Sequence, residues 1–526
     1  MRRAWVFAGL GLLACGAISY QVMGSWKYFR FSGTRLQANL AQPDALIRSK
    51  NLAQMPRDLL KVPMARDVLT EDLAFYYDQH EDRLGVNGAI KRIAFEHELE
   101  WSDQIFLSVF NEPAELALWR DGKGALRHYA LVMRRNMFAK VLEQAAKVAL
   151  KDLQLKQAGE ISTAAGSAKV LALEVNPRRT LLLISQGDTL VVLSDPGLLM
   201  NGGEKINADA KSAIVNWFDH SDALARQFAL DPKSSSKHSM VLGTPTMALG
   251  YGSLLSGVKG LRFDFGGTGN TWATSVWLEK GKNAAGDAAL WRAAPANPAA
   301  CVVVPLDASI LKKVVQEAEK KPELPNLPEF DGSALACWYR ESSLYSPVFV
   351  MHLKSNAAQR NAAFPILAKW ALTNPVEASK GDTLIWRSAG KPKADEAGKK
   401  ARKNQNAAKS NATLAARGEY WVFSPDGALA DKVLATIARS HPSVADQTNA
   451  GNATLAMLTP KPLAGMAERE MMDSVKDDSN LRDALQTHLP ARIKALAAYP
   501  AYKLELVNQR QADWQRVEWQ AQDGRK

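Results

Sequence analysis

Two short runs of the sequence hold residue types that could do chemistry. Ser234 and Lys237 have the Ser-x-x-Lys spacing that lets a lysine activate a serine across one helical turn. Pro232 and three consecutive serines favour a loop at this place, and no Lys-Thr-Gly triplet follows in the chain. The run Gly266–Gly269 could bind a phosphate through backbone amides. It lacks the Gly-Lys-Ser/Thr ending of a P-loop, so we expect a hairpin turn.

A third stretch is the densest group of acidic residues and histidines. It comprises Asp78, His80, Glu81 and Asp82, followed by Glu96, His97 and Glu98. Two histidines among carboxylates could hold a divalent metal, but the second group lacks the other histidine of a zinc-protease helix. Solvated helix faces are the simpler interpretation. The sequence therefore assigns no catalytic, cofactor-binding or metal-binding residue, and it implies no cofactor.

The elements that position these residues are a mixture of strands and helices. Apolar runs and alternation predict strands at 113–119, 128–135, 169–175, 179–185, 188–193, 261–265, 271–278, 334–338, 348–353, 382–386, 419–423, 453–458, 502–507 and 517–520. Apolar residues at three- and four-residue steps predict helices at about 70–80, 88–98, 138–149, 207–218, 221–230, 357–372, 428–438, 466–472 and 481–498.

The second half of the sequence resembles the first. Ala130–Met133 matches Val348–Met351, and Val192–Leu198 matches Val422–Ala428. An insertion in the second copy accounts for the larger offset of the later match. We therefore predict an internal duplication within an α+β fold. This fold has mostly antiparallel sheets, helices packed on one face, and one transmembrane helix ahead of them.

The N-terminal residues have the composition of a membrane anchor. Ala4 to Met23 form an uncharged, mostly apolar run, which as a helix would span a hydrocarbon core of ~30 Å. The aromatic and basic residues from Trp26 to Arg30 suit a membrane–water interface. A cleaved signal ending near Gly24 and a lipoprotein signal modified at Cys15 are the alternatives. We expect residues 1–24 to be the anchor and residues 25–50 to be a tether.

The rest of the chain has ordinary globular composition, 47% hydrophobic and 23% charged. We expect two halves, 51–300 and 301–526. Half of the net charge of +12 comes from residues 391–417, which hold eight basic and two acidic residues. Residues 391–412 are poor in apolar bulk and are predicted to be a disordered basic insertion. Such a stretch suits a solvated loop or a contact with anionic lipid, and nucleic acid is not an expected partner.

Cysteine usage leaves two alternatives open. Cys301 and Cys337 both lie in apolar, strand-like segments, and the third cysteine, Cys15, lies in the predicted span. An oxidising compartment would permit a disulfide between the first two. Buried free thiols that behave as small hydrophobes are the simpler interpretation of the pattern. Neither cysteine has the CxxC spacing of a redox or zinc site.

Four runs carry a family resemblance: Met55–Pro63, Thr70–Tyr77, Glu81–Gly85 and Ala117–Gly124. They resemble the YfaA-like family of uncharacterised bacterial envelope proteins, over most of the chain after the anchor. This family has no established activity, so the resemblance assigns no catalytic residue to this chain. Genes of this family often neighbour one for an alpha-2-macroglobulin-like protein. That implies an accessory role in an envelope protease-trapping system.

Anchor, composition and resemblance together predict a single-pass inner-membrane protein with its large domain in the periplasm. Its expected partners are the membrane, through the N-terminal helix, and an envelope protein. A non-catalytic binding or assembly role is favoured because no nucleophile and base converge in the sequence. An envelope hydrolase with an unrecognised active site is the alternative.

Overall fold

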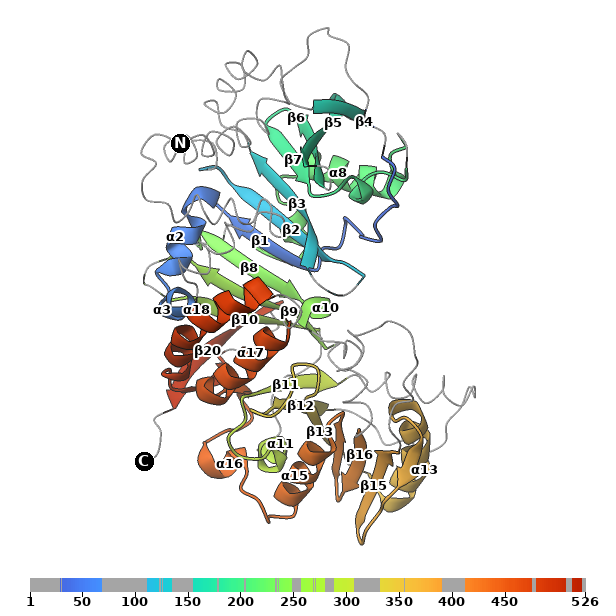
Figure 1. Cartoon of the computed structure of the whole chain (residues 1–526), viewed down its shortest axis with the longest axis vertical. Coiled ribbons are helices and arrows are strands. Elements are labelled where there is room, and N and C mark those ends of the chain that lie inside the picture. The colour runs from blue at the N-terminus through green and yellow to red at the C-terminus, as the bar shows by residue number, and fades with distance from the viewer. Residues whose placement is uncertain are drawn as a thin grey trace. The chain divides into compact units, whose positions relative to one another are not determined.

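The computed structural model describes residues 29, 31–68, 111–134 (without 123 and 125), 155–247 (without 177–178, 203–204, 232–233 and 235), 257–279 (without 268 and 270), 288–306, 332–389 (without 354), 412–474, 479–507 and 513–522. The chain forms two compact units (Figure 1). The first comprises Met1–Met247 and Gly260–Ala273, and the second comprises Ala248–Lys259 and Thr274–Lys526.

The first unit is built on an antiparallel sheet. Its strands are β1 (Ala45–Ser49), β2 (Ala114–Arg120), β3 (Leu126–Arg134), β4 (Leu155–Thr163), β5 (Gly166–Asn176), β6 (Arg179–Gln186), β7 (Thr189–Leu193), β8 (His238–Gly243) and β9 (Val258–Phe265). They pair in the order β9–β8–β1–β2–β3–β7–β6–β5–β4. The consecutive residues Leu181–Ile184 of β6 are all buried, so both faces of that strand are covered.

Short helices join and cover these strands. They are η1 (Leu52–Gln54), α2 (Met55–Leu60), α3 (Pro63–Val68), η2 (Pro196–Leu198), α8 (Ala208–Asp219), α9 (Ala223–Gln227) and α10 (Thr244–Met247). The carboxamide of Asn207 starts α8 by accepting a hydrogen bond from the Ala210 N–H at 2.9 Å. From α8, Ile214 and Trp217 are buried.

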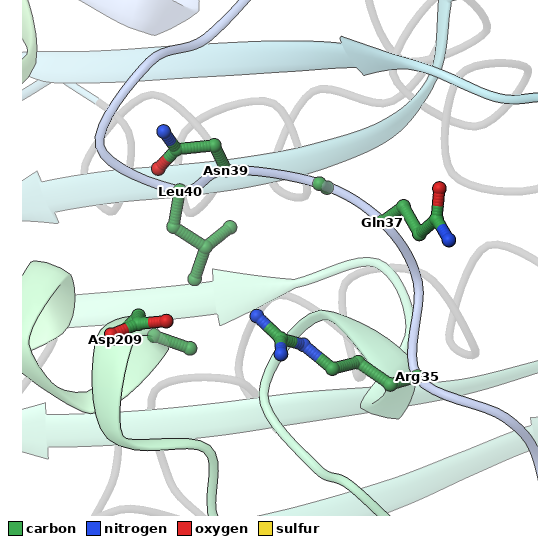
Figure 2. Close-up of a pocket in the computed structure, with 7 residues that line it drawn as sticks. Arg35, Gln37, Asn39, Leu40 and Asp209 are labelled. Atoms are coloured by element: carbon green, nitrogen blue, oxygen red, sulfur yellow. The ribbon is translucent and has the colours of Figure 1, made fainter.

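Residues 31–44 run along the first unit before β1 begins. The Leu36 N–H donates to the Gly197 carbonyl at 2.9 Å, and Leu40 is buried. Between this segment and the start of α8 lies a pocket of about 580 Å³, in which Arg35 and Asp209 face each other (Figure 2). Residues 45–49, which fall within the predicted tether, form β1 and are paired on both sides, with β2 and β8.

The second unit holds a longer series of antiparallel strands. They are β10 (Ala273–Leu278), β11 (Ala300–Leu306), β12 (Gly332–Trp338), β13 (Val348–His352), β14 (Pro375–Glu377), β15 (Thr383–Ser388), β16 (Thr413–Arg417), β17 (Tyr420–Ser424), β18 (Thr454–Leu458), β19 (Ala501–Leu506) and β20 (Trp514–Gln522). The pairing order is β10–β20–β19–β18–β11–β12–β13–β17–β16–β15–β14.

The two units share one pairing pattern. The series β2–β3–β7–β6–β5–β4 of the first unit has the same order as β12–β13–β17–β16–β15–β14 of the second. In the structure Phe349 of β13 takes the place of Ala130 of β3, because Ala130 pairs with Leu193 and Phe349 pairs with Phe423. The sequence match equates Ala130 with Val348, so it is displaced by one residue along this strand. Val132 and Val350 are both buried. The amphipathic helix expected at 138–149 lies outside the described residues.

The helices of the second unit are α11 (Ala288–Ala293), α13 (Ala357–Ala371), α15 (Gly427–Ile437), α16 (Val444–Gln447), α17 (Pro460–Ser474) and α18 (Ser479–Ala497). Asn356 and Gln359 start α13 with a capping box. The side chain of Asp426 starts α15 by accepting from the Ala428 N–H at 3.0 Å.

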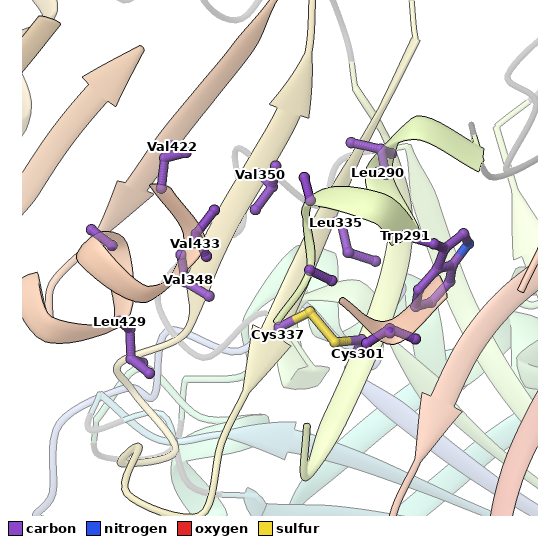
Figure 3. Packing of buried hydrophobic residues seen from close by; sticks show 14 of the residues in the cluster. Leu290, Trp291, Cys301, Leu335, Cys337, Val348, Val350, Val422, Leu429 and Val433 are labelled. Carbon is purple, nitrogen blue, oxygen red and sulfur yellow. A yellow bond between two sulfur atoms is a disulfide. The ribbon is translucent and has the colours of Figure 1, made fainter. Parts of the chain in front are cut away.

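Helices cover both faces of the second unit's sheet. On β17, Trp421 packs with Phe364 of α13, their ring centroids 4.8 Å apart. The next residue, Val422, lies on the opposite face in a core that includes Leu429 and Val433 of α15 (Figure 3). Successive strand residues point to opposite faces. One strand therefore contributes to two separate cores.

The predicted fold class is wrong. The described chain is mostly antiparallel sheet, with more residues in strands than in helices, and the helices are not confined to one face. The expectation failed because continuous apolar strands such as β13 indicate cover on both faces, whereas one-sided cover requires alternation. The predicted anchor, residues 1–24, lies outside the described residues. No helix in the described part is long and apolar enough to cross a membrane.

The two strand cysteines form a disulfide. Cys301 on β11 and Cys337 on β12 are directly paired in the sheet, and both are buried (Figure 3). Their Cα atoms are 4.1 Å apart. The bridge thus links neighbouring strands within the core that α15 covers.

Of the predicted basic insertion, residues 391–411 lie outside the described residues, while Ala412 is buried and precedes β16.

Candidate functional site

The polar residues of interest lie at the centre of the first unit's sheet. In the antiparallel pair of β1 and β8, Ser49 lies opposite His238, and Arg48 lies opposite Ser239. Because side chains alternate along a strand, these two pairs lie on opposite faces of the sheet. Each pair belongs to its own network of polar side chains.

On the face covered by α2, three side chains form a hydrogen-bonded chain. The Ser49 hydroxyl lies 2.9 Å from Nδ1 of His238, and Nε2 of His238 lies 3.0 Å from a carboxylate oxygen of Asp58. Asp58 comes from α2, whose first turn contains Pro56. The ammonium of Lys61, one turn later on the chain, donates to Asp58 at 2.6 Å. All three members of the chain are less than 5% exposed.

The protonation states of this chain follow from its surroundings. Burial alone would raise the pKa of Asp58, but hydrogen bonds from Lys61 and His238 outweigh it and hold that pKa below its usual value. Burial lowers the pKa of His238 despite the neighbouring carboxylate. We therefore assign a neutral imidazole that donates Nε2–H to the ionised Asp58. Its Nδ1 is then free to accept the hydroxyl proton of Ser49.

Neighbouring groups enclose the imidazole. The ring of Phe265 on β9 lies 5.0 Å from the His238 ring, centroid to centroid. Gly266 follows with a φ of +75°, and a Cβ atom there would lie 2.7 Å from Cδ2 of His238. A glycine is thus required at this turn for two reasons, the positive φ and the close approach. The result is a histidine with no exposed side-chain surface.

The arrangement has the groups of a nucleophile and a general base. A neutral imidazole oriented by a carboxylate can take the proton of a serine hydroxyl, as in serine hydrolases. Here serine meets Nδ1 and aspartate meets Nε2, which reverses the usual order on the ring. Ser49 is only 1% exposed, so a substrate would need the cover of the site to open. The alternative is a structural role, in which the three side chains hold β1, β8 and α2 together. That role requires no opening of the site.

The second unit builds the same sheet without this chain. By strand order and register, Pro305 of β11 takes the place of Ser49, since Pro305 pairs with Ser333 as Ser49 pairs with Ala114. Proline carries no hydroxyl. The strand order that the two units share therefore forms in the second unit without a hydroxyl at this position.

On the opposite face, Glu115 of β2 forms a buried ion pair. Its carboxylate lies 3.6 Å from the guanidinium of Arg48 and accepts backbone N–H bonds from Leu224 and Ala225 at the start of α9. Burial nevertheless dominates and raises the pKa of Glu115 to about 7. On the same face, the Ser239 hydroxyl donates to Asp264.

The raised pKa of Glu115 predicts an unusual pH dependence. The folded state holds this proton up to about pH 7, whereas the unfolded chain releases it near its ordinary value of about 4.5. Between these values the unfolded state binds fewer protons, so the contribution of Glu115 to stability falls as pH rises. We expect Glu115→Gln to remove a slope of roughly 1 kcal/mol per pH unit across this window.

Urea unfolding at a series of pH values measures this slope as the difference between wild type and variant. Glu377→Gln is the control, because Glu377 is an exposed strand carboxylate. If the difference in unfolding free energy between wild type and Glu115→Gln stays constant from pH 4.5 to 7, the pKa of Glu115 is not raised in the folded protein.

The structure places the sequence candidates as follows. Ser234 and Lys237 lie in the loop before β8, with Lys237 3.9 Å from Asp58. Gly266 lies in the turn after β9, as expected, where it abuts His238. The acidic and histidine-rich stretch at 78–98 lies outside the described residues. Within the described ranges, no group of three His, Cys, Asp or Glu side chains is placed to hold a metal ion.

Sequence reasoning missed the Ser49–His238–Asp58 chain. Its members are separated by up to 189 positions, so no local spacing announces them. The available signals were indirect. Asp58 lies in the Met55–Pro63 run that carries the family resemblance, and His238 opens a short apolar run that becomes β8.

These features define a class: a two-unit protein of antiparallel sheets, with a buried polar network in one unit and a buried disulfide in the other. A family model described as "Uncharacterized protein conserved in bacteria (DUF2138)" matches residues 30–521, and the chain belongs to that family. It is 27% identical to "Uncharacterized protein YfaA" of Escherichia coli (strain K12), over 98% of this chain and 97% of that protein. No solved structure matches the chain.

Proposed function

We propose that this protein is a single-pass inner-membrane protein whose large body lies in the periplasm and acts by binding or assembly. The observation that carries the location is the buried Cys301–Cys337 disulfide. Disulfides form and persist in oxidising compartments such as the periplasm, and they are rare in the cytosol. The apolar run from Ala4 to Met23 supplies the anchor for this location.

The burial of Ser49 favours binding over catalysis. The hydroxyl that the His238–Asp58 pair could activate is enclosed by the sheet, by α2 and by the turn at Gly266. The family resemblance further implies an accessory role beside an alpha-2-macroglobulin-like envelope protein. Affinity capture of the full chain from crosslinked membranes, with mass spectrometry of the bound proteins, tests that partner. Enrichment equal to that of an unrelated anchored protein would argue against it.

The location is tested on the mature protein. We expect the intact mass of protein purified from membranes to correspond to the whole chain of 57.5 kDa. We also expect Cys301 and Cys337 to react with maleimide in denaturant only after reduction. A chain lacking residues 1–24, produced in the cytosol, is the control and should carry two free thiols. Loss of the residues through Gly24, or a diacylglycerol on Cys15, would refute the retained anchor.

An envelope hydrolase is a second candidate, favoured by the hydrogen-bonded Ser49–His238–Asp58 chain. A fluorophosphonate probe, which reacts with activated serines, distinguishes the two functions. The binding proposal expects no adduct at Ser49. An adduct that is lost in Ser49→Ala and kept in Ser239→Ala would instead establish a nucleophile. Ser239 is the matched control, because it is also a buried serine hydrogen-bonded on β8's opposite face.

A further inference from the structure

The chain that follows the predicted anchor is built into the first unit almost at once. The Phe29 N–H donates a hydrogen bond of 2.8 Å to the carbonyl of Gln157 on β4, and Phe29 is only 9% exposed. Further along, Leu36 is bonded to Gly197 and Leu40 is buried. Phe29 and residues 31–44 therefore belong to the folded body and do not act as a free spacer.

The strand that receives Phe29 is an edge strand. Among the described strands, β4 pairs only with β5, at the end of the series β3–β7–β6–β5–β4. The hydrogen bond from Phe29 therefore attaches the N-terminal segment to the last described strand of this series. The N-terminal segment thus adds to the sheet edge through its backbone, which is how extended segments commonly attach to sheets.

Chain length then limits how far this edge can lie from the membrane. The apolar run ends at Met23, six residue steps before Phe29. Six extended residues span at most about 21 Å. The aromatic residues Trp26 and Tyr28 and the cation Lys27 fall within this interval, and such side chains suit the headgroup region. Part of this maximal span of about 21 Å lies within the headgroup layer, so Phe29 lies closer than that to the membrane surface.

We propose that the β4 edge of the first unit faces the lipid headgroups and is held there by the short connection between Met23 and Phe29. This inference rests on the proposed function, because it requires the N-terminal run to be a retained anchor. It assigns the β4 edge to the membrane surface. Binding partners of the periplasmic body must then use other surfaces.

A headgroup quencher tests the proposal on the full chain in lipid nanodiscs. Bimane is attached to a cysteine introduced at Glu160, an exposed β4 residue, in a Cys15→Ala background whose disulfide protects the other cysteines. The matched site is Gln54, an exposed residue just after β1, six strand spacings or roughly 29 Å from β4 along the sheet. With nitroxide-headgroup phosphatidylcholine, we expect quenching at residue 160 to exceed that at residue 54 about threefold.

A second variant tests the cause of the proximity. Ten Gly/Ser residues inserted between Gly24 and Ser25 add a maximal length of about 35 Å while leaving the folded body unchanged. We expect quenching at residue 160 to fall to the level at residue 54. Equal quenching at both sites without the insertion, or quenching that survives it, would overturn the proposal. Release of the protein from membranes by carbonate would instead refute the anchor, so the two failures are distinguishable.

Discussion

Replacing the disulfide pair, as Cys301→Ala with Cys337→Leu, is expected to lower the free energy of unfolding of the second unit by about 4 kcal/mol. The bridge closes a loop of 36 residues, and losing it restores that conformational freedom to the unfolded chain. The replacement residues copy the first unit, where Ala45 and Leu118 hold the corresponding strand pair. The volume of the core is thereby largely kept, so the loss of unfolding free energy measures the contribution of the disulfide itself.

Amide hydrogen exchange measures this effect unit by unit. We expect faster exchange on β11, β12 and β13, while β5, β6 and β7 of the first unit keep their protection. Cys15→Ala is the matched control, because it removes the third cysteine and leaves the bridge intact. Unchanged exchange on β11 and β12 in the double variant would mean that strand pairing alone fixes this core.

Replacing Asp58 by asparagine is expected to destabilise the first unit by about 4 kcal/mol, because it removes the charged partner from a buried network. The carboxylate accepts from His238 at 3.0 Å and from Lys61 at 2.6 Å, and it is 4% exposed. An asparagine keeps one acceptor, but its NH₂ group faces a donor, and Lys61 loses its counter-charge. Thermal unfolding followed by near-UV circular dichroism reports the loss.

Asp222→Asn is the control for this variant. Asp222 also pairs with a cation one helical turn away, Arg226, but that cation is exposed. Asp222→Asn should therefore lower the free energy of unfolding by less than about 0.5 kcal/mol. The loss from Asp58→Asn should also shrink as pH falls through the lowered pKa of Asp58, since that carboxylate stabilises the fold only while ionised. Equal losses in both variants would contradict the network.

The positions of most strands could be predicted from the sequence. Runs such as Val348–His352 and Leu181–Ile184 are apolar, β-branched or both, and turn residues bound them. The strand β1 was missed because two of its five residues, Arg48 and Ser49, are polar. These are the residues that enter the two buried networks. The chemistry that makes β1 interesting is therefore also what hid it in the sequence.

The arrangement of the strands and the candidate site could not be predicted in the same way. Local spacing finds a motif only when its residues are neighbours in the chain, and Asp58 and His238 are 180 positions apart. Continuous apolar strands such as β13 indicate cover on both sheet faces, but the sequence did not show that α13 and α15 supply it on opposite sides of β17. The strand order and the candidate site became visible only from the strand pairing and the burial of side chains in the structure.

The position of β1 between β2 and β8 has a consequence for how the first unit folds. Ser49 pairs with His238, 189 positions later, whereas β5, β6 and β7 are joined by short turns. Local hairpins form early, and pairings of large sequence separation form late because the loop between them must first be closed. Synthesis delivers β1 long before β8. One edge of β1 stays open to other chains throughout that interval, which is when the growing protein most needs protection from aggregation.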